Sequence, residues 1–168
     1  MPVVSGSSSR DVATSLAPLM GMQYIELESR RFPDGEGYVR VPSDAIDAVR
    51  SEPVVLVSNT YPDSGIVNTV LLLEAIAEVR RGNLSNLKGE EPQNMEDVGS
   101  GVYLAIPYYG YSRQDKRFSK GEAVSARVIA DILARGCDGI AILDLHEPAV
   151  LKDMEVPIEF VSSMPEIA

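Results

Sequence analysis

The chain has 168 residues, of which 45% are apolar, and 15 Lys and Arg against 25 Asp and Glu give it a formal net charge of −10. This length suits a single domain over residues 1–168, and the apolar content is enough for a hydrophobic core, which excludes disorder along the whole chain. The negative charge argues against a non-specific binder of nucleic acid or of an anionic membrane, because both carry the same sign of charge.

Strand and helix patterns alternate along the chain. Apolar and β-branched runs predict strands at residues 3–4, 23–28, 37–41, 53–57, 102–106 and 140–143. Apolar residues at helical spacing predict helices at about residues 11–20, 66–79 and 124–133. Strands that alternate with helices are typical of βαβ units. We therefore expect an α/β fold, with three layers, a mostly parallel sheet and helices on both of its faces.

Local signals refine the helices. Ser8 or Ser9 can cap the first helix, and Gly21 can take the left-handed position after its end. The apolar side of the last helix is predicted to consist of Val124, Val128, Ile129, Ile132 and Leu133.

Residues 82–101 interrupt the alternation. The segment holds four Gly, three Asn, one Pro and four acidic residues, with no sustained period. A surface loop of this length is usually either functional or disordered. Its composition favours a flexible insertion.

The cysteine content and the hydropathy of the chain indicate the cellular compartment to expect. The single Cys137 excludes an intramolecular disulfide, and with only one histidine the chain cannot form a Cys/His zinc cage. The first residues turn polar after Val4, and residues 70–73 are far too short an apolar stretch to span a bilayer. We expect a soluble, reduced, cytoplasmic protein.

Ligands of open α/β sheets bind beyond the carboxyl ends of the strands. Four polar segments follow or link the predicted strands, at residues 5–10, 30–36, 108–120 and 144–147. In the first, the backbone N–H groups and serine hydroxyls could cradle an anion at a helix start. The alternative is an ordinary serine-capped helix, and the spacing and lysine of a P-loop are missing.

The second segment places Phe32 beside a Pro-Asp-Gly turn, with Asp34 and Glu36 next to it. An exposed aromatic ring flanked by two carboxylates could stack on a nucleobase and accept hydrogen bonds from its amino edge. The alternative is a plain turn whose phenylalanine packs back into the core.

The third segment concentrates positive charge in an acidic protein. Arg113, Lys116, Arg117 and Lys120 fall within eight residues, and only Asp115 offsets them before Lys120. Such a loop suits phosphate, which arginine can bind through two parallel hydrogen bonds. The alternative is a solvated loop with tyrosines packed beneath it.

The fourth segment contains the only histidine. At the two-residue period of a strand, Asp144 and His146 would point to the same face. The pair could contact Mg²⁺ and phosphate or act as an oriented acid–base pair, or the histidine could be structural. A Ser–His–Asp triad is not indicated, because no nucleophile elbow is present.

In this order, the segments resemble ribose-phosphate pyrophosphokinases, the PRPP synthetases, and archaeal members most closely. The motifs that carry the resemblance are Ser5-Gly6-Ser7-Ser8-Ser9-Arg10, Arg31-Phe32-Pro33-Asp34-Gly35-Glu36, Tyr38-Val39-Arg40, Pro107-Tyr108-Tyr109-Gly110-Tyr111-Ser112-Arg113-Gln114-Asp115 and Asp144-Leu145-His146. The resemblance implies a phosphoribosyltransferase-like α/β fold. It also implies transfer of the β,γ-diphosphate of Mg-ATP to ribose 5-phosphate, which gives PRPP and AMP.

Site residues follow from the same resemblance. Adenine would be bound by Phe32, Asp34 and Glu36, in the family typically from a neighbouring subunit. The rest of ATP would be held by Arg113 and Gln114, with Asp115 nearby. His146 would be the catalytic residue that contacts the ATP phosphates and Mg²⁺, and Asp144 a second candidate metal ligand.

The chain departs from the family in length. Family members are about twice as long, and their second domain carries the Thr-Gly-Gly-Thr type loop for ribose 5-phosphate, a mobile loop with a catalytic Lys and Arg, and a later metal-binding aspartate. None of these motifs is found in residues 1–168. We therefore expect an N-terminal domain without its C-terminal partner, weak or inactive alone, that forms a homo-oligomer or assembles with a second synthetase domain. The alternatives are a non-catalytic ATP-binding subunit of a complete synthetase and a decayed gene product.

Overall fold

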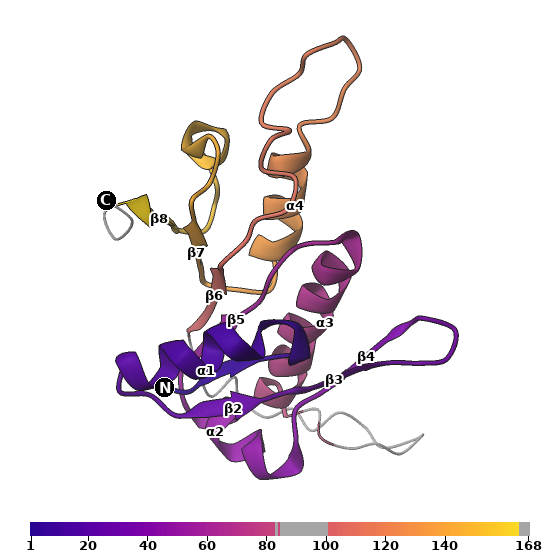
Figure 1. The fold of residues 1–168 in the computed structure, drawn as a ribbon. Helices are drawn as coiled ribbons and strands as arrows, with labels where there is room; N and C mark the ends of the chain where they lie inside the picture. Colours follow the sequence, from indigo (N-terminus) through magenta and orange to yellow (C-terminus); the bar gives the residue numbers. More distant parts are fainter. Residues whose placement is uncertain (83, 85–100, 165–168) are drawn as a thin grey trace.

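The structure is a computed structural model, and it describes residues 1–82, 84 and 101–164 (Figure 1). In chain order its elements are β1 (Val3–Ser5), η1 (Ser7–Ser9), α1 (Arg10–Leu19), β2 (Tyr24–Glu26), β3 (Glu28–Arg31), β4 (Gly37–Arg40), η2 (Ser43–Ala45), α2 (Ile46–Ser51), β5 (Val54–Val57), α3 (Asp63–Arg80), β6 (Val102–Ile106), α4 (Ser125–Ala134), β7 (Gly139–Leu143), η3 (Pro148–Leu151) and β8 (Ile158–Val161).

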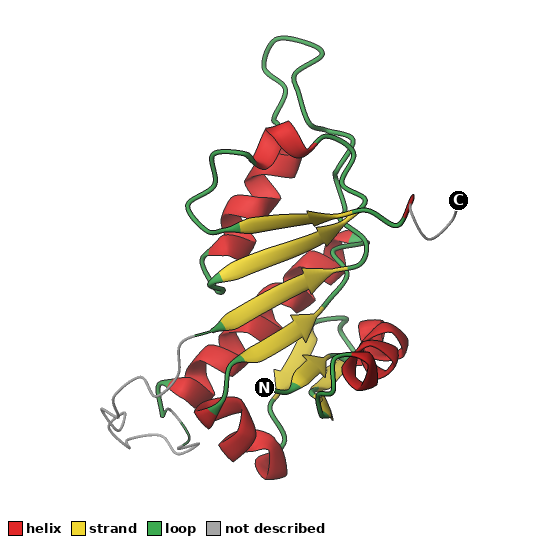
Figure 2. Ribbon diagram, turned by 90° about the vertical axis from the view of Figure 1, so that its left-hand side faces the viewer, coloured by secondary structure: helices red, strands yellow, loops and turns green. Residues whose placement is uncertain are grey.

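Six parallel strands form the central sheet, in the order β2-β1-β5-β6-β7-β8 (Figure 2). Strands β3 and β4 pair antiparallel as a separate hairpin. This arrangement confirms the predicted α/β class with a mostly parallel sheet.

Helices cover both faces of the sheet, as predicted, but unevenly. Helices α2, α3 and α4 pack on one face, where Leu56, Leu104 and Ile142 meet Leu72 and Ile76 in the main core. All five of these side chains are fully buried, and each such side chain contributes about 1.5–3 kcal/mol to stability. Helix α1 packs alone on the other face, where Ala13 and Ala17 contact the smaller cluster of Val3, Val55 and Val57.

The predicted apolar side of α4 is partly wrong. Val128 and Ile132 are 48% and 39% exposed, whereas Ala126, Ala130 and Leu133 are buried. The buried face is rotated toward the alanines, whose short side chains let the helix backbone lie close to the sheet. Val124 precedes the helix as its N-cap residue.

Three other local expectations change. The side chains of Ser8 and Ser9 do not cap α1; the Ser9 hydroxyl instead accepts a hydrogen bond from the backbone N–H of Asn59, at 3.1 Å. The strand predicted at residues 23–28 is divided between β2 and β3, with buried Leu27 between them. Strand β8, which pairs with β7, was not predicted. Gly21 does take the left-handed conformation, with φ 64°.

The flexible insertion predicted at residues 82–101 falls mostly on residues 83 and 85–100, outside the described part of the chain. Within the described part, no helix combines the length and the apolar character that crossing a membrane requires.

Candidate functional site

The carboxyl ends of the parallel strands meet at one edge of the sheet, and four connecting segments begin there (Figure 2). They follow β1, β5, β6 and β7, which are neighbours in the sheet, so three of the four predicted polar segments and the new segment after β5 lie next to one another. The edge therefore carries the loop of residues 107–124, which we call the basic loop, between the residues that follow β5 and Asp144, which follows β7.

The cations of the basic loop are open to solvent. Arg113, Lys116, Arg117 and Lys120 are all exposed, and within the described residues no carboxylate forms a salt bridge with any of them. Arg117 donates from Nε to the carbonyl oxygen of Glu122 at 3.0 Å. This cluster of positive charge is available to an anionic ligand.

Only one of the loop's tyrosines packs beneath it. Tyr109 is 3% exposed, and its hydroxyl donates to the carbonyl oxygen of Ala126 at 2.7 Å. Burial raises the pKa of Tyr109 above its ordinary value. Tyr108 and Tyr111 are 57% and 44% exposed, so the predicted alternative of a loop with tyrosines packed beneath it holds for Tyr109 alone.

Asn59 and Thr60, two polar residues after β5, hold the start of the basic loop. Neither was predicted from the sequence as a site residue. The Oδ1 of Asn59 accepts from the N–H of Tyr108 at 3.0 Å. The N–H of Thr60 donates to the carbonyl oxygen of Tyr108 at 3.2 Å, and its Oγ1 accepts from the N–H of Gly110 at 2.7 Å. We call this set of contacts the β5–β6 clasp. Its only sequence signal is polar residues directly after a fully buried strand.

The residues after β7 do not continue the strand. Strand β7 ends at Leu143, and Asp144 has a left-handed φ of 48°. The prediction that Asp144 and His146 point to the same face of a strand is therefore wrong. Within the described residues, no hydrogen bond joins the two side chains. His146 is exposed at the carboxyl edge.

Asp144 is held by Ser163. Its Oδ1 accepts from the N–H of Ser163 at 2.9 Å, and its Oδ2 accepts from the Ser163 hydroxyl. These hydrogen bonds lower the pKa of Asp144 below its ordinary value, so the carboxylate is charged at neutral pH.

The donor set fits Mg²⁺ that arrives with a phosphate ligand. The described residues contain no group of three or more His, Cys, Asp or Glu side chains arranged to hold a metal ion. Mg²⁺ commonly uses only one or two carboxylates, with substrate phosphates and waters completing its shell. Asp144 could supply one such oxygen ligand, whereas the imidazole of His146 is better suited to hydrogen bonding with a phosphate oxygen.

The β3–β4 hairpin presents the predicted aromatic–carboxylate motif. Phe32 is 39% exposed and does not pack into the core. Its ring packs edge to face with that of Tyr38 at a centroid distance of 5.7 Å, and the Arg30 guanidinium lies over both rings, 5.0 Å from the centroid of Phe32 and 4.1 Å from that of Tyr38. At the turn, Asp34 Oδ1 accepts from the N–H of Glu36 at 3.0 Å.

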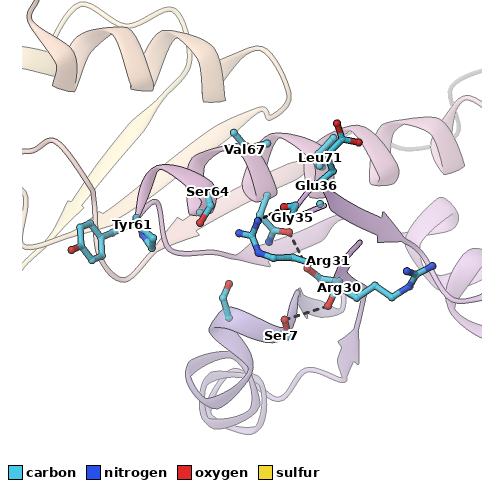
Figure 3. A pocket seen from close by; sticks show the side chains of 15 residues that line it. Ser7, Arg30, Arg31, Gly35, Glu36, Tyr61, Ser64, Val67 and Leu71 are labelled. Atoms are coloured by element: carbon cyan, nitrogen blue, oxygen red, sulfur yellow. Dashed lines mark hydrogen bonds between the residues drawn. The ribbon is translucent and has the colours of Figure 1, made fainter. Parts of the chain in front are cut away.

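A pocket of about 570 Å³ lies between this hairpin, η1 and the start of α3 (Figure 3). Its lining includes Ser7, Arg30, Arg31, Tyr61 and Ser64. Ser7 and Ser8 of the first predicted segment therefore face this hollow, whereas Ser5 and Ser9 are buried. Arg31 donates from Nη1 to the carbonyl oxygen of Gly35 at 2.7 Å.

The predicted site residues of a single chain do not all lie close to one another. The hairpin with Phe32 and the basic loop with Arg113 project from the body in different directions (Figure 1). The basic loop and the segment with Asp144 and His146, in contrast, follow neighbouring strands.

Comparison with known proteins identifies relatives. The sequence model for the N-terminal domain of ribose phosphate pyrophosphokinase matches residues 99–136, which include the basic loop. The ribose-phosphate pyrophosphokinase of Methanothermobacter thermautotrophicus is 36% identical over 99% of this chain and 51% of its own length. Those of Methanobrevibacter smithii and Halobacterium salinarum are each 34% identical over 99% of this chain, which covers 49% and 51% of theirs.

A solved structure shows the same fold. The crystal structure of phosphoribosylpyrophosphate synthetase from Mycobacterium smegmatis matches with a TM-score of 0.78 at 20% identity, over 98% of this chain and 49% of that one. The chain thus spans about half the length of the relatives it matches.

Proposed function

This chain belongs to the ribose-phosphate pyrophosphokinase family, and from that premise we propose that it binds Mg-ATP and supplies the ATP half of diphosphate transfer to ribose 5-phosphate. In that reaction the anomeric hydroxyl oxygen forms a bond to the β-phosphorus of ATP. The bond between the β-phosphorus and the oxygen that bridges to the α-phosphate breaks, AMP leaves, and the hydroxyl proton is released.

The exposed cations of the basic loop carry the proposal. In a chain of net charge −10, four cations stand at the ligand edge without a salt bridge in the described part. Catalysis of phosphoryl-type transfer depends mainly on positioning and on neutralising the charge of the phosphates. Arg113 and Gln114 would hold the ATP phosphates, and Asp115 lies beside them in the loop.

The residues after β7 would complete the phosphate site. His146 would donate a hydrogen bond to a phosphate oxygen, and Asp144 would hold Mg²⁺ through its carboxylate. The ion supplies neutralisation of the charge on the β- and γ-phosphates.

The hairpin would bind the base. The ring of Phe32 would stack on adenine, with Asp34 and Glu36 accepting hydrogen bonds from its amino edge. Because the hairpin and the basic loop of one chain project apart, we propose that the hairpin serves the ATP site of a neighbouring copy in a homo-oligomer.

The acceptor half of the site would come from elsewhere. The motifs for ribose 5-phosphate named above are not in this sequence, and the relatives are about twice as long. We expect little or no activity from these 168 residues alone, and activity when the other half of a relative is supplied.

Calorimetry and an AMP assay test the proposal. Mg-ATP should bind the chain, and EDTA should weaken binding because it removes the ion that neutralises the phosphate charge. Arg113→Ala should weaken binding by about tenfold or more, since hydrogen bonds to charged groups contribute about 1.5–3 kcal/mol each. Adding ribose 5-phosphate and the separately produced second half of a relative should give AMP. Absence of Mg-ATP binding at millimolar concentration would refute the proposal.

The same assays separate the second candidate, a non-catalytic ATP-binding subunit. That role predicts ATP binding with no AMP in the presence of the acceptor half, and a changed rate when the chain is added to a complete synthetase. The retained base-binding motif at Phe32 is the observation that favours it.

A further inference from the structure

Tyr111 has an unusual backbone conformation in the middle of the basic loop. Its φ is 65°, in the left-handed region that bulky side chains rarely occupy. Such a conformation persists only where the surroundings enforce it, and it is found most often at functional sites. Some contact must therefore hold Tyr111 in place.

That contact is with the first residue of α3. The Tyr111 hydroxyl donates to Oδ1 of Asp63 at 2.7 Å, and the two residues are 48 positions apart in the sequence. The hydrogen bond to Asp63 raises the pKa of Tyr111, as expected for a hydroxyl that donates to a carboxylate. The link joins the loop after β6 to the helix that follows β5.

The backbone of Tyr111 in turn fixes Gln114. The N–H of Gln114 donates to the carbonyl oxygen of Tyr111 at 2.9 Å, and the carbonyl oxygen of Gln114 accepts from the N–H of Ala126 at 3.3 Å. Arg113 lies inside this short turn. Any change in the φ of Tyr111 therefore redirects Arg113 and Gln114 together.

The β5–β6 clasp does not reach this far. It ends at Gly110, so the turn of residues 111–114 depends on Tyr111 for its attachment to the β5 side of the molecule. The clasp places the start of the loop, and the Asp63–Tyr111 pair places the part that carries the proposed ATP ligands.

We propose that the hydrogen bond between Tyr111 and Asp63 is a positioning link that sets the geometry in which Arg113 and Gln114 meet the phosphates of ATP. The assignment to ATP rests on the proposed function. Neither residue touches the ligand; they act through the backbone of the turn.

Hydrogen exchange of the full chain tests the link without any ligand. Tyr111→Phe removes only the hydroxyl, and the Gln114 amide should exchange about tenfold faster, since the loss of one charge-assisted hydrogen bond lowers the free energy of local opening. Asp63→Asn keeps an oxygen acceptor and should preserve most of the protection, whereas Asp63→Ala should not. Tyr103→Phe, on an exposed tyrosine of β6 at the far end of the strand, is the matched control and should leave the exchange rate unchanged.

Ligand titration then tests the role in phosphate binding. Tyr111→Phe should raise the Kd of both Mg-ATP and inorganic triphosphate about fivefold to tenfold, with adenosine binding and the melting temperature unchanged. Unchanged exchange at Gln114 in Tyr111→Phe, or equal triphosphate affinity of the variant and the wild type, would overturn the inference. A wild-type chain that binds neither Mg-ATP nor triphosphate would refute the proposed function and the phosphate role, and the exchange rates would still decide whether the link orders the turn.

Discussion

At the residue scale, Gly110 shows how tightly the start of the basic loop is packed. A Cβ at this position would lie 2.3 Å from the carbonyl oxygen of Thr60, closer than real Cβ contacts come. The absence of a side chain lets the backbone N–H of Gly110 reach the Thr60 hydroxyl. The motif predicted as a phosphate loop thus contains a glycine that is required for packing.

Gly110→Ala should therefore damage both stability and binding. The added methyl group must push the loop away from β5, and overpacking of this kind costs about 1–3 kcal/mol. Chemical denaturation should show that loss, and ATP titration should show weaker binding, because the clasp places Arg113 and Gln114. Ser112→Ala, in the same loop, removes a hydroxyl with no hydrogen bond in the described residues and should stay within about 0.5 kcal/mol of the wild type. Equal stability of the two variants would contradict the packing argument.

Cys137 is a second residue whose environment has a measurable effect, here on the reactivity of its thiol. Burial raises the pKa of the Cys137 thiol to about 11, so at pH 8 the reactive thiolate is scarce in the folded chain. Alkylation by iodoacetamide at pH 8 should be roughly 200-fold slower than in the urea-unfolded chain, where the pKa returns to about 8.5, and the folded rate should rise as the pH approaches 11. Similar rates in the folded and unfolded chains would contradict the burial of this thiol.

At the element scale, the β3–β4 hairpin is distinct from the rest of the fold. It pairs only with itself and forms no part of the six-stranded sheet. Its tip residues are exposed, and the Phe32 ring is ordered by Arg30 and Tyr38 rather than by the core. An element of this kind can lose its tip side chain with little effect on the stability of the domain.

Phe32→Ala should separate binding from stability. Stacking of a base on an aromatic ring contributes about 1–3 kcal/mol, so the Kd for ATP should rise by about tenfold, whereas the Kd for inorganic triphosphate and the melting temperature should barely change. Leu19→Ala, on a side chain that is 85% exposed at the end of α1, is the control and should alter none of the three. A large fall in melting temperature with Phe32→Ala would mean that the ring serves the fold.

At the scale of the whole molecule, the separation of the hairpin from the basic loop is the main constraint on function. The two proposed parts of one ATP site lie on different sides of the chain. Under the proposed function, a complete site would therefore need two copies of the chain.

Mixing variants tests this arrangement. Phe32→Ala and Arg113→Ala each damage a different half of the site. A co-refolded 1:1 mixture should regain about a quarter of the tight Mg-ATP sites, because random assembly in a cyclic oligomer pairs an intact hairpin with an intact loop that often. Titration of the mixture against each variant alone measures the gain. A mixture that binds no better than the separate variants would show that each site is built within one chain.

The sequence alone predicted the alternation of strands and helices, because apolar periodicity is a local property, but it missed α2 and β8. It also indicated the resemblance to ribose-phosphate pyrophosphokinases, through motifs such as Phe32-Pro33-Asp34-Gly35-Glu36, and the concentration of charge around Arg113. It failed for α4, where the apolar pattern includes Val128 and Ile132 but packing selects the small alanines. It failed for Asp144 and His146 because β7 ends at Leu143, three residues before His146, and Asp144 has a left-handed backbone.

Only the tertiary structure decided how the site is held. Asn59 with Tyr108, Thr60 with Gly110 and Asp63 with Tyr111 are each separated by 48 to 50 residues, so no local pattern connects them. They meet because β5 and β6 are parallel neighbours whose carboxyl ends reach the same edge. The charged residues of the basic loop can be identified from the sequence. Which polar residues hold that loop in position is determined by the pairing of the strands.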